Sequence, residues 1–303
     1  MNILITGAGG LLGREAAAVL APRHKVTALT SWELDITDPD RVRQAVQRLA
    51  PEVVLNCAAF ADVDACESER DRALAVNAAG PGNLALALAR YGGKLIHIST
   101  DYVFDGQKPP PAAYTEEDAP NPLSWYGKTK LAGENAVKEV LENHAIVRTA
   151  WLYGRHGRGF LNLLIDLTVK RRLAEIRVVE DQFGTPTWAW RLAQQLARLI
   201  EADARGLFHA TAEGWCSRYE LARFFLEQMG IDCRIVPCPS TEFPTPAVRP
   251  KNSILENKGL KDAGLNLMRD WQEDMAEFAA KFREQLLSLS KADDKPSKNL
   301  GDI

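Results

Sequence analysis

The sequence predicts an α/β protein with a doubly wound parallel sheet and a smaller mixed α/β lobe. In the first 150 residues, short apolar runs alternate with segments whose apolar residues recur at helical spacing. Strands joined by helical crossovers form a parallel sheet that is covered by helices on both faces. The first apolar run also ends in closely spaced glycines, which is typical of a strand that turns tightly into a helix.

Each element of this first half follows from a local pattern. Apolar runs predict strands at residues 2–6, 25–29, 52–56, 94–98 and 145–148. Helical spacing predicts helices at residues 11–20, 39–50, 70–90 and 124–141. Asp38 is expected to cap the second of these helices, and Pro39 stands at the first helical position, where proline is favoured.

After Trp151 the alternation loosens. Helical patterns lie at 158–172, 189–202, 217–229 and 272–287, with a short strand at 207–209. We therefore assign residues 1–150 and about 185–210 to the sheet domain, and about 151–184 and 211–287 to the smaller lobe. The polar segment 288–303 has no apolar period, so we expect a disordered tail.

Length and composition exclude several protein classes. With 303 residues, of which 46% are hydrophobic and 25% charged, the chain is an ordinary globular protein and not a disulfide miniprotein. A net charge of −3 gives no electrostatic reason to bind nucleic acid or a membrane surface. Five scattered cysteines, no secretion signal and no apolar stretch of about 20 residues predict a cytoplasmic protein with reduced thiols.

The glycines after the first strand have the spacing of a phosphate-binding loop. Gly7, Gly10 and Gly13 form a GxxGxxG pattern between a strand and a helix, the context of a Rossmann-type dinucleotide site. Gly7 permits the tight turn, Gly10 lets backbone N–H groups approach a pyrophosphate, and Gly13 lets the helix pack close to the sheet. A glycine-rich turn without a ligand is the alternative.

The end of the second strand bears on the choice of cofactor. NAD sites usually place an acidic residue there to bind the ribose 2′-hydroxyl, and this strand ends with Thr30 and Ser31. A carboxylate at that point would repel a 2′-phosphate, so we predict NADPH as cofactor, with NADH possible and used no better. Asp35 and Ile36 follow, and they either face the adenine or simply form a turn before the Asp38 cap.

A phenol and an ammonium lie one helical turn apart at the start of the fourth helix. Tyr126 and Lys130 are four residues apart and therefore share a helix face. A nearby cation favours the phenolate, so we expect Lys130 to lower the pKa of Tyr126 and make it an acid–base group near neutrality. A surface tyrosine beside a solvated lysine is the alternative.

Two neighbouring strands end in residues suited to a ligand. The fourth strand runs into Ser99, Thr100, Asp101 and Tyr102, and the third runs into residues 56–59 (NCAA). In a doubly wound sheet, ligands bind at the carboxyl ends of the strands. The hydroxyl cluster is therefore a candidate for substrate binding, and the small residues suit a flat ligand close to the backbone. A Ser/Thr turn that satisfies its own backbone is the alternative.

These motifs resemble the dTDP-4-dehydrorhamnose reductase family of the extended short-chain dehydrogenases/reductases. The resemblance rests on the glycine loop, 99–106 (STDYVFDG), 126–134 (YGKTKLAGE), 148–153 (RTAWLY), 181–187 (DQFGTPT) and 249–253 (RPKNS), and covers the chain to about residue 287. It implies NAD(P)H-dependent reduction of the 4-keto group of dTDP-4-dehydro-L-rhamnose to dTDP-L-rhamnose.

The resemblance also implies residue roles. Tyr126 would protonate the 4-oxygen, with Lys130 and Thr100 as its catalytic partners. The residues implied for the cofactor are Gly7, Gly10, Leu11, Leu12, Gly13, Asp35, Ile36, Cys57, Ala58, Ala59, Tyr126 and Lys130. The residues implied for the substrate are Thr100, Asp101, Tyr102, Trp151, Arg249 and Asn252.

Departures from the family pattern leave alternatives open. Ala61 stands where the family often has threonine, which removes one hydroxyl. Some members dimerise around magnesium, but the helix after Pro186 has no carboxylate in its first turn, so we predict no metal; a homodimer stays possible. Two alternatives are a 4-ketoreductase of another nucleotide-deoxysugar and a non-catalytic subunit like the regulatory subunit of methionine adenosyltransferase.

Overall fold

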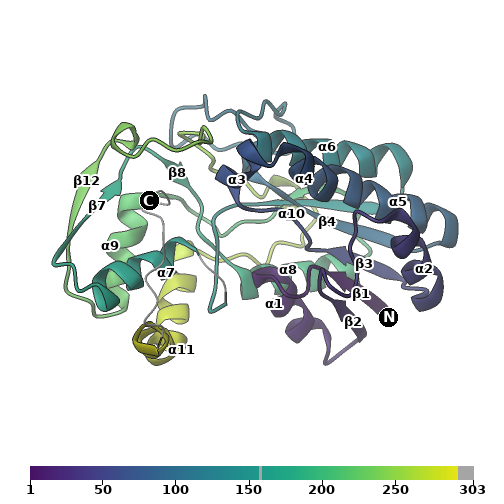
Figure 1. Ribbon diagram of the computed structural model, residues 1–303, viewed down its shortest axis with the longest axis horizontal. Helices are drawn as coiled ribbons and strands as arrows, with labels where there is room; N and C mark the ends of the chain where they lie inside the picture. The colour runs from purple at the N-terminus through teal and green to yellow at the C-terminus, as the bar shows by residue number, and fades with distance from the viewer. Residues whose placement is uncertain (157–158, 293–303) are drawn as a thin grey trace.

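The larger lobe of the molecule is built around a six-stranded parallel sheet (Figure 1). The computed structural model describes residues 1–156 and 159–292, the last four of these by their backbone alone. The strand order is β10-β5-β4-β3-β1-β2, and every neighbouring pair is parallel. The bounds are β1 (Asn2–Thr6), β2 (Lys25–Leu29), β3 (Val53–Asn56), β4 (Lys94–Thr100), β5 (His144–Thr149) and β10 (Gly206–His209).

Helices cover both faces of this sheet, because its strands are apolar on both sides. Ile3 and Ile5 face the core beneath α1 (Leu11–Leu20) and α8 (Ala189–Glu201). Leu4 faces the opposite core beneath α2 (Pro39–Leu49), α5 (Gly80–Tyr91) and α6 (Trp125–Val140). The predicted doubly wound α/β fold is confirmed, and so are the Asp38 cap and Pro39 at the start of α2.

The predicted helix over residues 70–90 contains a change of helix type. It consists of α4 (Arg70–Leu74), a π-helical turn (Ala75–Ala79) and α5. Asn77 lies in the π-helical turn, and its side chain bonds to both backbone groups of Phe60 and to the Thr129 hydroxyl. These distant partners hold the wider turn, and they also fix the loop that follows β3. A short helix in this region, α3 (Val63–Ser68), was not predicted.

The smaller lobe has its own core, at the left of Figure 1. It contains α7 (Phe160–Ile165), a π-helical turn (Asp166–Lys170), α9 (Arg218–Gln228), α11 (Trp271–Ala292), and a parallel pair formed by β7 (Glu175–Val179) and β12 (Arg234–Cys238). The short strand β6 (Leu152–Tyr153) precedes these elements in the chain. Between them lie the short strands β8 (Phe183–Gly184), β9 (Thr187–Trp188) and β11 (Cys216–Ser217), and the helix α10 (Lys258–Asp262). Short 3-10 turns span Asp101–Val103 and Ser240–Glu242.

The last helix is longer than the sequence predicted. α11 continues to Ala292, so the expected start of a disordered tail at Ser288 is wrong, and 288–292 are helical. The spacing of apolar residues ends near Leu287, but the helix continues without it. The remaining tail, 293–303, lies outside the described residues, as does residue 158, the first of the helix expected over 158–172.

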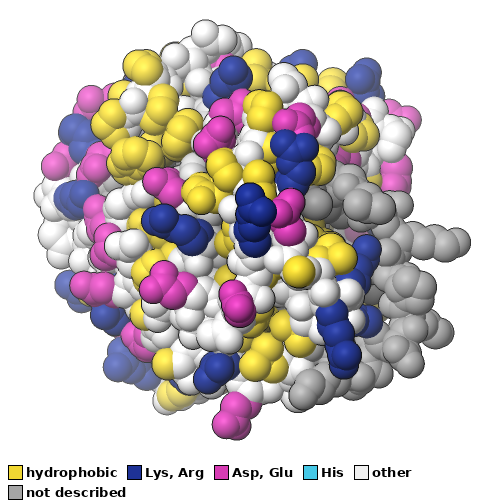
Figure 2. Space-filling model, turned by 90° about the vertical axis from the view of Figure 1, so that its left-hand side faces the viewer, with side chains coloured by type: hydrophobic (Ala, Val, Ile, Leu, Met, Phe, Trp, Pro, Cys, Tyr) yellow, Lys and Arg dark blue, Asp and Glu magenta, His cyan; other side chains and the backbone are white. Residues whose placement is uncertain are grey.

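Surface chemistry is mixed. Figure 2 shows basic and acidic side chains interspersed with apolar ones over the face that the smaller lobe presents. All five cysteines are free thiols. Over the described ranges, no helix is long and apolar enough to cross a membrane. In the same ranges, no three His, Cys, Asp or Glu side chains gather to hold a metal ion.

Candidate active site

The glycine loop is shaped by close contacts with the next strand. Gly7 has φ +68°, and a Cβ there would lie 2.5 Å from the backbone nitrogen of Ala58. A Cβ on Gly13 would lie 2.4 Å from the carbonyl oxygen of Gly7. Gly10 is the N-cap of α1, where no side chain caps the free N–H groups and the first turn contains no acid. The helix start can therefore accept an anion such as a pyrophosphate.

The residues predicted to bind the cofactor are only partly gathered around this loop. Cys57 and Ala58 lie directly against Gly7, and burial raises the pKa of the Cys57 thiol, so it is a neutral wall. Leu12 belongs to α1, and its side chain is buried in the core between this helix and the sheet. Ile36 is buried beneath Gly80 of α5.

The segment after β2 holds a turn and an acidic residue, Glu33, that the sequence pattern did not place at the strand end. Asp35 accepts hydrogen bonds from the N–H and hydroxyl of Thr37, so its carboxylate closes the turn before α2. Glu33 reaches back to the strand end and accepts bonds from the N–H and the hydroxyl of Thr30, both at 2.8 Å. These bonds hold the pKa of Glu33 below its ordinary value. A carboxylate therefore does stand at the end of β2, contrary to the prediction.

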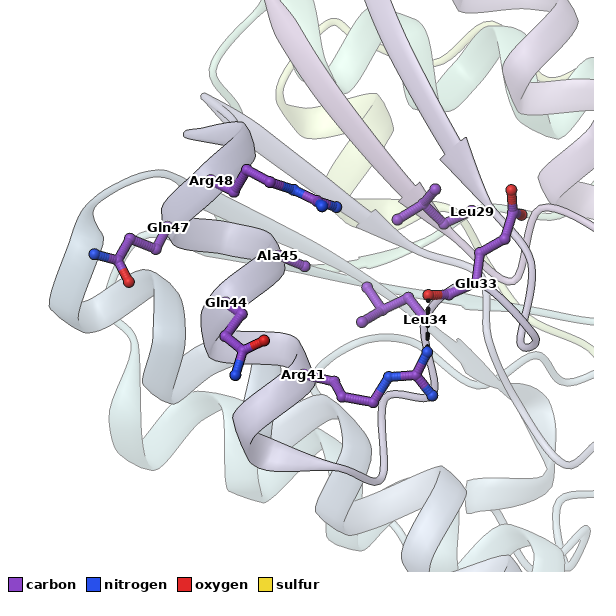
Figure 3. Close-up of a pocket in the computed structure, with 8 residues that line it drawn as sticks. All are labelled: Leu29, Glu33, Leu34, Arg41, Gln44, Ala45, Gln47 and Arg48. Carbon is purple, nitrogen blue, oxygen red and sulfur yellow. Dashed lines mark hydrogen bonds between the residues drawn. The ribbon is translucent and has the colours of Figure 1, made fainter.

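A surface hollow of about 630 Å³ adjoins this acid, between the edge strand β2 and α2 (Figure 3). Arg41 donates to the carbonyl oxygen of Glu33 across it. Its walls are Leu29, Glu33, Leu34, Arg41, Gln44, Ala45, Gln47 and Arg48. None of these belongs to the hydroxyl cluster after β4, so we do not assign the hollow to the reaction.

The helix that carries the candidate acid packs directly on the segment after β4. A Cβ on Gly127 would lie 2.1 Å from the carbonyl oxygen of Tyr102, and one on Gly133 would lie 2.1 Å from that of Asn77. Both glycines therefore let α6 approach its neighbours at backbone distance. This contact sets the ring of Tyr126 edge-on against that of Tyr102, with centroids 5.8 Å apart.

The electrostatics of Tyr126 differ from the prediction. Burial raises the pKa of the phenol above its ordinary value, and a hydrogen bond with Thr100 opposes this only in part. The expected lowering by Lys130 is wrong, because its ammonium donates to the carbonyl oxygen of Ile98 at 2.6 Å. Burial instead lowers the pKa of Lys130 itself to about 8. Tyr126 is therefore a protonated phenol at neutral pH. Lys130, one helical turn further along α6, gives up its proton more readily than an ordinary lysine.

The hydroxyl cluster after β4 lies against Tyr126, through the hydrogen bond between Thr100 and the phenol. The Thr100 hydroxyl donates to the Asp101 carboxylate at 3.0 Å and accepts from the N–H of Tyr102. Asp101 is 3% exposed, and burial raises its pKa to about 6. Beneath the cluster, Ser99 donates to Glu134, which also accepts two bonds from Arg148.

Trp151, predicted to wall the sugar pocket, has an unusual backbone conformation. Its φ is +44°, which is uncommon for a residue with a side chain and marks a conformation that the surrounding contacts hold. A Cβ on Gly184 would lie 2.4 Å from the indole ring, so the glycine of the DQFGTPT string makes room for it. The guanidinium carbon of Arg218 lies 3.5 Å from the ring centroid. Sequence reasoning did not find Arg218.

The two substrate residues predicted near the C-terminus have different positions. Arg249 makes a two-pronged ion pair with Asp64 of α3, at 2.8 and 3.1 Å. Its charge acts on the pKa of Tyr102, so it borders the cluster. Asn252 is fully buried, and its amide donates to the carbonyls of Lys108 and Ala112 and accepts from the N–H of Ile254. The structure does not bring its side chain to the site.

Comparisons with known proteins identify the family of the chain. Residues 1–284 match the family model described as the RmlD substrate binding domain. The chain belongs to the RmlD family. The dTDP-4-dehydrorhamnose reductase of Mycolicibacterium smegmatis is 44% identical over 287 residues, which cover 92% of this chain and 85% of the relative. The dTDP-4-keto-6-deoxy-D-glucose reductase of Streptomyces niveus is 41% identical over 271 residues, covering 88% and 93%.

A solved structure of an RmlD family member supports the cofactor assignment. The dTDP-4-dehydrorhamnose reductase of Bacillus anthracis, in complex with NADP, has a TM-score of 0.88 and 37% identity to this chain. The match covers 92% of this chain and 98% of that one. The family resemblance predicted from the sequence is therefore confirmed.

Proposed function

We propose that the chain reduces the 4-keto group of dTDP-4-dehydro-L-rhamnose to dTDP-L-rhamnose with NADPH, and with NADH as a possible second cofactor. The observation that carries this is the hydrogen bond between Tyr126 and Thr100, at the point where Gly127 lets α6 touch the backbone of Tyr102. It presents a proton donor at the carboxyl edge of the sheet that also carries the glycine loop. Membership of the RmlD family supports it.

The residues of the glycine loop fit the cofactor. The uncapped N–H groups at the start of α1 would hold its pyrophosphate, Ala58 and Ala59 would lie beneath it, and Lys130 would hold the nicotinamide ribose. When bound, the reduced nicotinamide supplies a hydride.

The phenol of Tyr126 gives its proton to the 4-oxygen as negative charge develops there. The phenol is protonated at neutral pH, as a general acid must be, and the burial that raises its pKa also makes it a weaker acid. Thr100 orients the phenol and the carbonyl, and Trp151 walls the sugar.

Replacing the phenol tests the role of Tyr126. Tyr126→Phe keeps the ring and removes the acid, so kcat should fall about 10²–10⁴-fold while NADPH binding is unchanged. The assay follows NADPH oxidation at 340 nm with the 4-keto sugar made in situ, and the product is identified as dTDP-L-rhamnose. Tyr91→Phe is the matched control, because Tyr91 is an exposed tyrosine on α5. Near-normal turnover by Tyr126→Phe would contradict the assignment.

A second candidate function is reduction of the 4-keto group of another dTDP-deoxysugar. The relative from Streptomyces niveus is named for such a substrate and is nearly as similar as the one from Mycolicibacterium smegmatis. Both reactions use the same acid and hydride donor, and they differ in the configuration of the sugar. Parallel assays with both 4-keto sugars, with the C4 configuration of each product read by NMR, separate them.

The proposal also assigns a ligand to each lobe and a cellular location to the protein. Residues 1–150 and about 185–210 would bind the cofactor, and about 151–184 and 211–287 would cover the substrate. The assignment of Trp151 and Arg249 to the substrate side supports this. We place the protein in the cytoplasm, acting on a free nucleotide sugar without nucleic acid or membrane; five free thiols are consistent with a reducing compartment.

A further inference from the structure

Arg218 brings a charge from the smaller lobe onto the wall of the candidate site. It is the first residue of α9, and its guanidinium carbon lies 3.5 Å from the centroid of Trp151 and 5.2 Å from that of Phe160. At 3.5 Å the guanidinium lies against the ring, an arrangement that arginine favours on aromatic faces. The side chain is half-buried.

Within the described residues, no carboxylate forms a direct ion pair with Arg218, although the buried Asp101 acts on its charge from a distance. In the same residues its guanidinium makes no hydrogen bond, and it lies against the rings of Trp151 and Phe160. Other arginines withdrawn from solvent do have such partners: Arg148 with Glu134, Arg191 with Asp274, and Arg249 with Asp64. A partly desolvated cation without a partner is costly, and a bound anion would offset that cost.

The groups around Arg218 place it beside the hydroxyl cluster. Burial and the charge of Arg249 lower the pKa of Arg218, whereas Tyr102 and Asp101 raise it. Tyr102 and Asp101 follow β4, and Trp151 follows β5, so Arg218 faces the ends of these two strands. The glycine loop follows β1, two strands further along the sheet from β4. An anion at Arg218 would therefore be distinct from the cofactor's pyrophosphate.

We propose that Arg218, held flat against Trp151, binds the diphosphate of the nucleotide-sugar substrate. This inference rests on the proposed function, since the diphosphate is the anionic part of such a substrate. A guanidinium can donate two parallel hydrogen bonds to phosphate oxygens. Because Asp64 already offsets the charge of Arg249, Arg218 adds a positive charge at this end of the pocket that is free to meet a phosphate.

Binding of dTDP and thymidine to variants tests the proposal. Arg218→Met keeps an apolar stem on Trp151 and removes the charge. Its dissociation constant for dTDP should rise about 10–100-fold, the range for hydrogen bonds to charged groups, while binding of thymidine and NADPH is unchanged. Arg218→Lys should lose less, because it keeps the charge but not the fork. Arg223→Met on the exposed side of α9 is the matched control and should bind dTDP like the wild type.

The outcomes separate this proposal from the proposed function. Unchanged dTDP affinity in Arg218→Met, with a wild type that turns over the 4-keto sugar, overturns the diphosphate role alone. An equal loss of dTDP and thymidine binding also overturns it, because that pattern indicates a packing role. A wild type that binds NADPH but neither dTDP nor the keto sugar overturns both. If Arg218→Met also loses NADPH binding, Arg218→Lys decides by the same comparison of dTDP with thymidine.

Discussion

Gly127 offers a test of whether backbone contact between α6 and the segment after β4 sets the active geometry. In Gly127→Ala, the new Cβ would lie 2.1 Å from the Tyr102 carbonyl oxygen and 3.0 Å from the Pro122 side chain. Side-chain carbons essentially never approach an oxygen more closely than about 3 Å, so α6 and the 3-10 turn must separate by about 1 Å. Tyr126 is carried by one of these elements, and Thr100 stands at the start of the other.

The expected effect on catalysis exceeds the effect on stability. Overpacking costs about 1–3 kcal/mol, and alanine regains about 1 kcal/mol over glycine within a helix, so the net loss of stability is about 0–2 kcal/mol. A displacement of about 1 Å between reacting groups can lower the rate about 10²-fold. We therefore expect a folded variant that binds NADPH through the intact glycine loop, with kcat reduced about 10²-fold.

The measurement is kcat with NADPH and the 4-keto sugar, alongside unfolding in urea. Gly82→Ala is the matched control: Gly82 also lies in a helix, α5, but its Cβ would meet only the Ala136 methyl at 3.4 Å, an ordinary contact. This control should be as active as the wild type and slightly more stable. A Gly127→Ala enzyme with kcat within threefold of the wild type would refute the reasoning.

Two further predictions concern the cofactor. Glu33→Gln removes an exposed negative charge at the end of β2, so the ratio of kcat/KM for NADPH to kcat/KM for NADH should rise several-fold, and this gain should shrink at high salt. Asp35→Asn is the control, because its carboxylate is bound within the turn before α2. An unchanged ratio in Glu33→Gln would argue against an adenosine ribose at this point. Lys130 loses its charge as pH rises through its pKa of about 8, so kcat/KM for NADPH should decline above that pH. If Lys130→Met shows the same decline, the decline belongs to another group.

The sheet could be predicted from the sequence because its signals are local. Each strand is a short run of apolar residues, and a parallel sheet buried on both faces requires just such runs. The glycine loop was also predictable, since Gly7 and Gly13 are required by contacts within the same strand–turn–helix unit and with β3. α3 has no comparable signal, being six residues long with three of them acidic or hydroxylated.

The errors come from contacts that no periodicity reveals, some between residues far apart in the chain and some within a tight turn. The π-helical turn at Asn77 depends on Phe60 and Thr129, which no periodicity reveals. Glu33 follows β2 by four residues, and only the turn that brings its N–H onto the Thr30 carbonyl returns the carboxylate to the strand end. Asn252 belongs to a motif that indicates a ligand, yet three backbone groups use its whole amide.

Arg218 did leave a trace in the sequence, because it breaks a local rule. A cation at the first position of a helix opposes the macrodipole, a placement that costs about 0.3–1 kcal/mol. The Ser217–Glu220 capping box supports the start of α9 at the same point. Trp151 breaks a second rule by holding φ at +44°, and the two side chains are stacked on one another. Such conflicts between local preference and tertiary structure concentrate at functional sites. Two conflicts that meet in a single contact are stronger grounds for a binding role than either conflict alone.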